Sequence, residues 1–298
     1  MQLVIFIKRL VIIFLVSNSH LIASEALPKT GMIKLPVLAE QENLRVWYQL
    51  PEQLTPETAI VFVMHGVNRN ADEYRDAWVE LAKQNNFIVL VPEFTKQQFP
   101  RARSYNLGNM YKKDNQLNME DDWSFSVIER VFTQFKQQVN NNTERFYIFG
   151  HSAGAQFVHR LLLFKPTLAV ELAIAANAGW YTLPSYNHTF PYGLQESGID
   201  EVDISTYLSA PLFLLLGDKD NDPNDKHLRR AAEANRQGAH RFARGNYYYR
   251  FAKYKAAELK VPFNWQREVV KNVGHDNSLM APAAARIIKH HINKKPAK

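Results

Sequence analysis

The segment Arg145-Phe-Tyr-Ile-Phe-Gly-His-Ser-Ala-Gly-Ala-Gln-Phe-Val-His-Arg160 decides the fold of this chain. An apolar run predicts a buried strand up to Phe149, and the run from 156 to 164 predicts a helix. Between them stands G-x-S-x-G, centred on Ser152. A sharp turn between strand and helix leaves no room for side chains beside the serine, which explains the two glycines. We therefore expect Ser152 to be a nucleophile, with the backbone N–H of Ala153 facing a developing oxyanion. A glycine-rich turn with an incidental serine is the alternative.

An activated serine needs a carboxylate that orients its base, and in this architecture the acid follows the serine in the chain. The run 211–217 predicts a buried parallel strand, and three aspartates follow it. Asp220 stands three residues beyond the terminal glycine of this run, where the acid belongs. Asp218 and Asp222 are rivals, although aspartates at such positions often only cap turns.

The base is expected after the acid, at the end of the last strand. The stretch 268–273 is strand-like and leads into Gly274 and His275. His275 is therefore the predicted base. The remaining histidines that we weighed fall in helices, loops or the basic tail, where packing or solvation explains them: His159, His227, His240, His290 and His291.

A second oxyanion donor should come from the loop after an early strand. The run 59–64 predicts that strand, and His65-Gly66-Val67-Asn68 follows it. Gly66 permits a tight backbone, and the N–H of Val67 is the predicted donor. His65 could be mistaken for a base, but in this dipeptide we expect it to brace the loop through a side-chain hydrogen bond.

These motifs resemble those of α/β-hydrolases, and among them secreted esterases of the polyhydroxyalkanoate-depolymerase and feruloyl-esterase-like group. The chain has no Cys, whereas many secreted depolymerases carry disulfides. The resemblance implies a mostly parallel central sheet covered by helices on both faces, and a Ser-His-Asp triad. The matching segments are HGVNRNADEYRD (65–76), DDWSF (121–125), FGHSAGAQFVHR (149–160), NAGWYTLP (177–184), LGDKDNDPN (216–224) and VGHDNSLM (273–280).

Strand and helix patterns alternate along the rest of the chain, which also indicates a parallel, doubly covered sheet. No repeat or clear linker interrupts them, so residues 25–298 are expected to form a single domain. The further strands are predicted over 44–50, 87–91 and 169–175, and helices over 72–82 and from Asp122 to about Val139.

The first 24 residues have the pattern of a signal peptide. Basic residues precede the apolar run 10–16, and small and polar residues follow it. Cleavage after Ser24 or Ala26 would leave a secreted or periplasmic protein with no stable membrane span. An uncleaved anchor is the alternative.

The segment 180–208 lies between two predicted strands and is rich in aromatic residues. Insertions at this place often form a cap over the pocket, so Trp180 and Tyr181 are pocket candidates together with Asn68. The equally weighted alternative is a structural excursion whose aromatic side chains pack on the sheet edge.

The formal net charge is +7, and arginines and lysines are dense between 229 and 255. This density is typical of a solvated helix face, and attraction to anionic surfaces or polymers is the functional alternative. No nucleic-acid-binding motif accompanies it, so no nucleic-acid partner is expected.

The expected activity is hydrolysis of a carboxylic ester, small or polymeric, through an acyl-enzyme, without a cofactor or metal. A peptidase or an acyltransferase with the same triad is an alternative. A silent binding protein of the same fold is a third interpretation. The sequence leaves the oligomeric state open.

Overall fold

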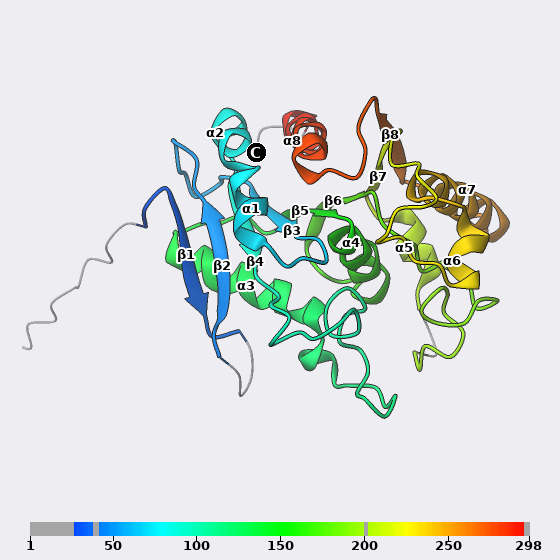
Figure 1. Ribbon diagram of the computed structural model, residues 1–298. Helices are drawn as coiled ribbons and strands as arrows, with labels where there is room; N and C mark the ends of the chain where they lie inside the picture. Colours follow the sequence, from blue (N-terminus) through cyan, green and yellow to red (C-terminus); the bar gives the residue numbers. More distant parts are fainter. Residues whose placement is uncertain (1–26, 38–41, 200–201, 295–298) are drawn as a thin grey trace, which may run out of the picture.

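The computed structural model describes residues 27–37, 42–199 and 202–294, so the predicted signal peptide lies outside the described residues. The described strands are β1 (Thr30–Leu35), β2 (Leu44–Gln49), β3 (Ile60–Met64), β4 (Ile88–Pro92), β5 (Phe146–His151), β6 (Val170–Ala176), β7 (Leu212–Gly217) and β8 (Gln266–Val270). They form one sheet in the order β1-β2-β4-β3-β5-β6-β7-β8 (Figure 1). Strand β2 pairs antiparallel with β1 and β4, and the pairs from β4 to β8 are parallel.

Helices pack on both faces of this sheet (Figure 1). The helical elements are α1 (Ala71–Asp76), α2 (Val79–Asn85), the 3-10 turn η1 (Glu120–Asp122), α3 (Ser124–Gln138), α4 (Ala153–Phe164), α5 (Ile204–Ser209), α6 (Ala232–Gln237), α7 (Arg241–Leu259) and α8 (Asn277–Lys294). The predicted fold class, a mostly parallel sheet between helical layers, is confirmed.

The alternation of side chains along the strands divides the core into two layers. In β3, Phe62 and Met64 pack in the layer with α3, α4 and α7, whereas Val61 and Val63 pack in the layer with α1, α2 and α8. All four side chains are fully buried. A central parallel strand is covered on both faces, so it reads as a continuous apolar run.

The structure differs from the sequence prediction in three elements. Strand β1 was not predicted, because it is an edge strand with a burial pattern that leaves only Leu35 fully covered. The predicted helix 72–82 is two helices, α1 and α2, separated where Trp78 turns into the core against Phe149, with ring centroids 5.3 Å apart. The helix predicted from Asp122 begins at Ser124 as α3, because Asp122 lies in η1.

Parallel strands have their carboxyl ends at the same edge of a sheet. The loops after β3, β5, β6, β7 and β8 therefore converge at that edge, although they are far apart in the sequence. They carry His65, Ser152, Asn177, Asp220 and His275 respectively.

Candidate active site

Ser152 occupies the sharp turn between β5 and α4. Its backbone has φ 59° and ψ −115°, a region that residues with side chains rarely adopt. A Cβ atom added to Gly150 would lie 2.3 Å from the carbonyl oxygen of Gly154, and one added to Gly154 would lie 1.9 Å from the carbonyl oxygen of Met64. The two glycines are therefore required by the turn itself and by its contact with β3. The strain at Ser152 is typical of a functional position.

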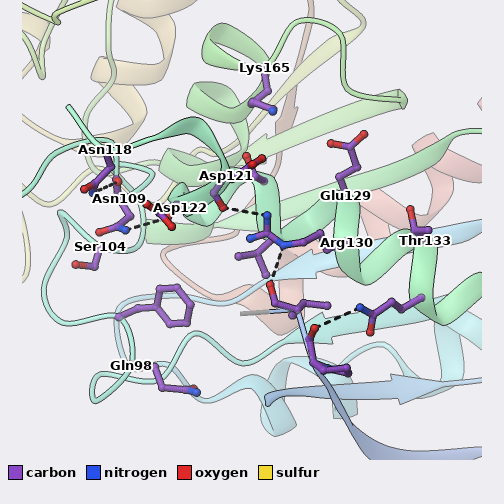
Figure 2. A pocket seen from close by; sticks show the side chains of 16 residues that line it. Gln98, Ser104, Asn109, Asn118, Asp121, Asp122, Glu129, Arg130, Thr133 and Lys165 are labelled. Carbon is purple, nitrogen blue, oxygen red and sulfur yellow. Dashed lines mark hydrogen bonds between the residues drawn. The ribbon is translucent and has the colours of Figure 1, made fainter. Parts of the chain in front are cut away.

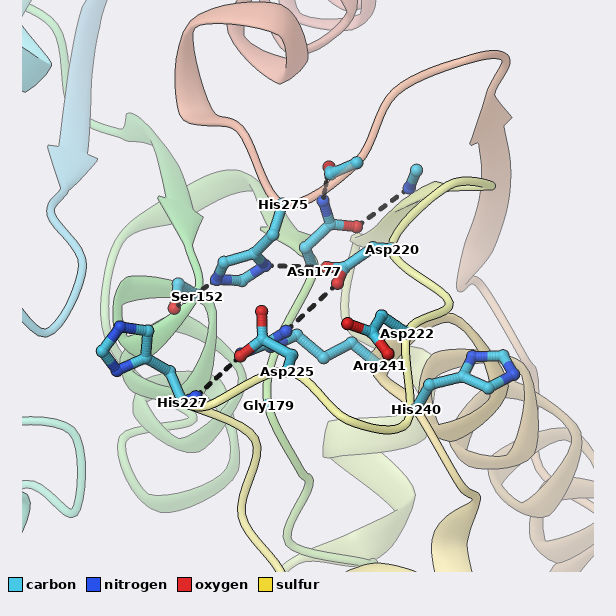
Figure 3. Close-up of polar contacts among 12 residues, drawn as sticks. Ser152, Asn177, Gly179, Asp220, Asp222, Asp225, His227, His240, Arg241 and His275 are labelled. Carbon is cyan, nitrogen blue, oxygen red and sulfur yellow. Dashed lines mark hydrogen bonds and ion pairs between the residues drawn. The ribbon is translucent and has the colours of Figure 1, made fainter.

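The structure brings Ser152, His275 and Asp220 together (Figure 3). The Oγ of Ser152 lies 3.0 Å from the Nε2 of His275, across 123 residues of sequence. The Nδ1 of His275 donates to the Oδ2 of Asp220 at 2.7 Å. The side chain of Asp220 is 4% exposed and that of His275 is 25% exposed. The carboxylate of Asp220 is thus shielded from water, whereas the ring of His275 is reachable from solvent.

The two rival carboxylates have other partners. Asp218 accepts a hydrogen bond of 2.7 Å from the backbone N–H of Asn272, which joins the ends of β7 and β8. Asp222 is exposed and accepts from the backbone N–H of Asn224 at 2.8 Å. Of the three aspartates, Asp220 is the one with a hydrogen bond to His275.

The predicted oxyanion loop lies against the serine. A Cβ atom added to Gly66 would lie 3.8 Å from the Cβ of Ser152 and 2.8 Å from the hydroxyl of Tyr74. The Tyr74 hydroxyl, rather than Ser152, therefore leaves too little room for a side chain at position 66. The next residue, Val67, has an exposed side chain, and Ala153 begins α4 directly after the serine.

His65 braces this loop, as the sequence predicted. Its Nε2 accepts a hydrogen bond of 3.1 Å from the backbone N–H of Phe94, so Nδ1 carries the proton and faces the carbonyl oxygen of Gly66 at 3.1 Å. Complete burial lowers the pKa of His65 to about 3. Because the His65 ring stays neutral and both of its nitrogens have hydrogen-bond partners, its role in the loop is structural.

Arg69 and Tyr105 fasten the long segment after β4 to the same loop. The guanidinium of Arg69 donates to the carbonyl oxygens of Phe94, Phe99 and Arg101 and lies 4.1 Å from the ring centroid of Tyr105. The hydroxyl of Tyr105 donates to the carbonyl oxygen of His65 at 2.7 Å.

Asn177, at the end of β6, joins the loops that carry the acid and the base. Its Oδ1 accepts from the backbone N–H of Gly217 at 2.9 Å, and its Nδ2 donates to the carbonyl oxygen of Gly274 at 3.0 Å. Its φ of 51° suits asparagine better than most residues. This role of Asn177 was not predicted from the sequence. The available signal was an asparagine placed directly after a buried strand.

Arg241 and Asp225 were also missed. Arg241 donates to Asp220 at 3.2 Å and to Asp225 at 3.0 Å (Figure 3). The hydrogen bond from Arg241 lowers the pKa of Asp225 to about 2. In the sequence, Arg241 is only one of the many basic residues between 229 and 255.

Two other members of that basic cluster have contrasting environments. Arg244 is buried and donates to the carbonyl oxygens of Gly179, Arg229 and Gly238. Arg250 is exposed on α7. The cluster therefore combines structural and solvated arginines.

Two further histidines are buried, His151 beside the site and His159 on α4. His151 precedes the serine, contacts the hydroxyl of Tyr74 at 3.2 Å, and has its ring centroid 4.6 Å from that of His275. Burial first, and then the positive charges of His275 and Arg241, hold the pKa of His151 well below its usual range. Burial does the same for His159 on α4, which accepts a hydrogen bond from the backbone N–H of Thr182.

The pocket candidates have different environments. Asn68 is exposed beside Val67. Trp180 is nearly buried, with its ring 4.7 Å from that of Tyr192 and 4.2 Å from the guanidinium of Arg160. Tyr181 is fully buried and stacks on Tyr248 at 4.3 Å. Their roles in substrate binding stay predictions.

A cavity of about 790 Å³ lies beside α3 and is lined mostly by polar side chains (Figure 2). Several of these side chains hold loops. Arg130 donates to the carbonyl oxygens of Val37 and Asp121, and Asn109 donates to that of Asp122. The lining of this cavity does not include Ser152, Asp220 or His275.

Within residues 27–37, 42–199 and 202–294, none of the helices combines the length and apolar character that crossing a membrane requires. Over the same ranges, histidine, aspartate and glutamate side chains do not gather into a group of three or more that could hold a metal ion.

A mostly parallel sheet with a strained serine at the end of β5, an aspartate after β7 and a histidine after β8 defines an α/β-hydrolase. No family model matches the chain, and neither does any curated protein sequence. Solved structures do match it, and two of them are similar over almost their whole length.

The first is poly(aspartic acid) hydrolase-1 from Sphingomonas sp. KT-1, which is 38% identical with a TM-score of 0.85, over 88% of this chain and 98% of that one. The second is LpqC, a poly(3-hydroxybutyrate) depolymerase from Bordetella parapertussis, which is 33% identical with a TM-score of 0.82, over 90% and 92% of the two chains. The chain therefore belongs to the α/β-hydrolase family of these two enzymes. An S-formylglutathione hydrolase from Agrobacterium tumefaciens, 12% identical with a TM-score of 0.57 over 89% and 94%, shares the fold.

Proposed function

We propose that the protein is a serine hydrolase that cleaves carboxylic esters through an acyl-enzyme. The strongest support is the continuous chain of hydrogen bonds from Ser152 through His275 to Asp220. Family membership supports hydrolysis in general, and the chain of hydrogen bonds supports this particular mechanism.

In the first half of the reaction, the Oγ of Ser152 attacks the ester carbonyl carbon and the Nε2 of His275 takes its proton. Negative charge gathers on the carbonyl oxygen, where the backbone N–H groups of Ala153 and Val67 donate to it. The bond to the alcohol oxygen then breaks, and His275 gives its proton to the departing alcohol.

In the second half, water attacks the acyl carbon, and the bond between that carbon and Ser152 breaks. His275 takes a proton from the water and returns one to the Oγ of Ser152. Throughout the cycle Asp220 orients the imidazole and stabilises its positive form.

Hydrolysis of an amide is the second candidate. The relative at 38% identity is named for poly(aspartic acid), a polymer joined by amide bonds, whereas poly(3-hydroxybutyrate) is joined by ester bonds. Removal of residues 1–24 takes Lys8 and Arg9 from the formal charge of +7 and leaves +5, which favours an anionic polymer over a neutral one. The same triad and acyl-enzyme would serve both bonds.

The test compares wild-type protein with Ser152→Ala on short aryl esters, poly(3-hydroxybutyrate) particles and poly(aspartic acid). We expect ester cleavage that requires Ser152. Cleavage of poly(aspartic acid) without cleavage of either ester would show that the protein hydrolyses amides instead. Product formation that depends on an added alcohol would identify acyl transfer.

A fluorophosphonate probe separates an enzyme from a silent binding protein of the same fold. We expect the probe to label the wild-type protein and not Ser152→Ala. A folded wild-type protein that is neither labelled nor active would refute the proposed function.

We also propose that residues 25–298 form a single domain and act outside the cytoplasm after signal cleavage. The cleavage site can be tested by expressing the full chain in cells and sequencing the amino terminus of the exported protein. The first residue should be Glu25 or Leu27. Retention of the first 24 residues in the membrane fraction would support an anchor instead.

The proposed substrate pocket includes Asn68, Trp180 and Tyr181, with the segment 180–208 as its proposed cap. If Trp180 binds the acyl group, Trp180→Leu should raise KM much more than it lowers kcat. Equal loss of kcat and stability would indicate that Trp180 only packs against Tyr192 and Arg160.

A further inference from the structure

Arg241 connects the triad acid to a second carboxylate (Figure 3). Its Nη1 donates to the Oδ1 of Asp220 at 3.2 Å, and its Nη2 donates to the Oδ1 of Asp225 at 3.0 Å. The other oxygen of Asp220 accepts from His275. Both oxygens of the buried acid are therefore occupied by charged or polar partners.

The start of α7 also holds the backbone of the acid. The backbone N–H of Phe242 donates to the carbonyl oxygen of Asp220 at 3.0 Å. Asp225 is fixed in turn, because its Oδ1 accepts from the backbone N–H of His227 at 2.7 Å. The side chain of Arg241 is 3% exposed and that of Asp220 is 4% exposed, so their contact is closed to water, whereas the side chain of Asp225 is 28% exposed.

A guanidinium next to the acid has an electrostatic cost for the base. The positive charge of Arg241 partly cancels the negative charge of Asp220, and this disfavours the imidazolium form of His275 that arises during catalysis. The carboxylate of Asp225 offsets the guanidinium in turn. Its influence reaches the base, because His275 is among the charges that lower the pKa of Asp225.

The charged or titratable groups near His275 come from several elements. His151 faces it from β5, Asp220 and Asp225 from the loop after β7, and Arg241 from α7. Asp276 follows it in the chain. Arg241 contacts both Asp220 and Asp225, and each contact joins opposite charges.

We propose that Arg241 and Asp225 are positioning residues of the triad, which fix the carboxylate of Asp220 and balance the charge around His275. This inference rests on the proposed function. Arg241 supplies the rigid contact, and Asp225 cancels the effect of the guanidinium charge on the base.

The two members of the pair should act in opposite directions. Arg241→Met removes a positive charge, so the midpoint of the pH profile of kcat/KM should rise by about half a pH unit or more. Asp225→Asn leaves the guanidinium unbalanced, so the midpoint should fall by a similar amount. The double variant should return close to the wild-type midpoint.

Arg241→Lys separates geometry from charge. It keeps the positive charge but loses the planar fork that bridges the two carboxylates. Its midpoint should stay near that of the wild type, while kcat falls. Two matched controls remove charge elsewhere: Arg250→Met on the exposed part of α7, and Asp222→Asn in the loop that carries Asp225. Neither control should move the midpoint.

The experiment measures the pH profile on a short ester and, in parallel, the NMR titration of the His275 ring, assigned with His275→Gln. The NMR arm needs no turnover. An inactive wild-type protein would therefore refute the proposed function while the pair is still tested. Shifts of opposite sign support the pair. Unchanged midpoints, or shifts of the same sign, overturn it. If Arg241→Met does not fold, the direction found for Asp225→Asn decides.

Discussion

The side-chain amide of Asn177 donates a hydrogen bond of 3.0 Å to the backbone carbonyl oxygen of Gly274, the residue before His275. The oxygen of the same amide accepts from Gly217, at the end of the strand that leads to Asp220. One side chain thus sets the separation between the loops of the acid and the base.

We expect Asn177→Ala to lower kcat by about 100-fold, because a small misplacement of the base is costly. The variant should also lose about 1–3 kcal/mol of stability, since the N–H of Gly217 is left unpaired. Ester kinetics and urea unfolding measure the two effects. Asn177→Asp keeps the acceptor for Gly217 and loses the donor to Gly274. It should keep more stability than Asn177→Ala and still be slow. Unchanged kcat in both variants would contradict a positioning role.

Ser152→Ala should lower ester hydrolysis by about a million-fold, as is typical when the nucleophile of a triad is removed. The fold should survive, because alanine is smaller than serine and the glycines around it already provide the space. Circular dichroism establishes folding, and burst kinetics measure the rate. A folded variant with wild-type turnover would exclude Ser152 as the nucleophile.

Asp220→Asn should lower kcat by about ten-thousand-fold, because an amide stabilises the wrong tautomer of His275. Asp222→Asn should be nearly neutral, since Asp222 is exposed and holds a local turn. Asp218→Asn should mainly affect stability through the contact with Asn272. Comparing the three variants on the same ester tests the assignment. If Asp218→Asn or Asp222→Asn proves the crippled enzyme, the acid must be reassigned.

Stability should decrease as the pH falls below about 6.5, because three buried histidines stay neutral in the folded protein. The pKa of His65 is lowered to about 3, and those of His151 and His159 are also well below the usual range. The unfolded chain binds protons near pH 6.5 that the folded chain excludes. Each histidine therefore removes up to about 1.4 kcal/mol per pH unit between its folded and unfolded pKa values.

Urea unfolding between about pH 7.5 and pH 5.5 measures this decline. His65→Gln cannot titrate at this position, so its stability should fall less steeply than that of the wild type. His290→Gln, a control at an exposed position on α8, should leave the slope unchanged. Equal slopes in the wild type and His65→Gln would show that burial of His65 does not govern the acid response.

Local sequence was enough to predict the turn at Ser152, because the restriction is steric and lies within a few residues. The glycines on either side meet backbone atoms at distances that exclude a Cβ. The continuous apolar runs of the inner strands likewise predicted the parallel sheet, since burial on both faces removes polar positions. The edge strand β1 lacked this signal, because only one of its six residues is fully buried.

The sequence favoured Asp220 by its distance from Gly217 and left Asp218 and Asp222 as rivals, and only the tertiary structure shows which of the three carboxylates contacts His275. The choice depends on which carboxylate lies within reach of His275, and strand ends far apart in the chain determine that distance. The contacts of Asn177, and those of Arg241 with Asp225, likewise depend on segments that only the tertiary structure brings together. Local sterics and periodicity in the sequence were enough to predict the turn at Ser152 and the fold. The converging loops at the carboxyl edge of the sheet decided the partners, because hydrogen bonds between them require positions that only packing sets.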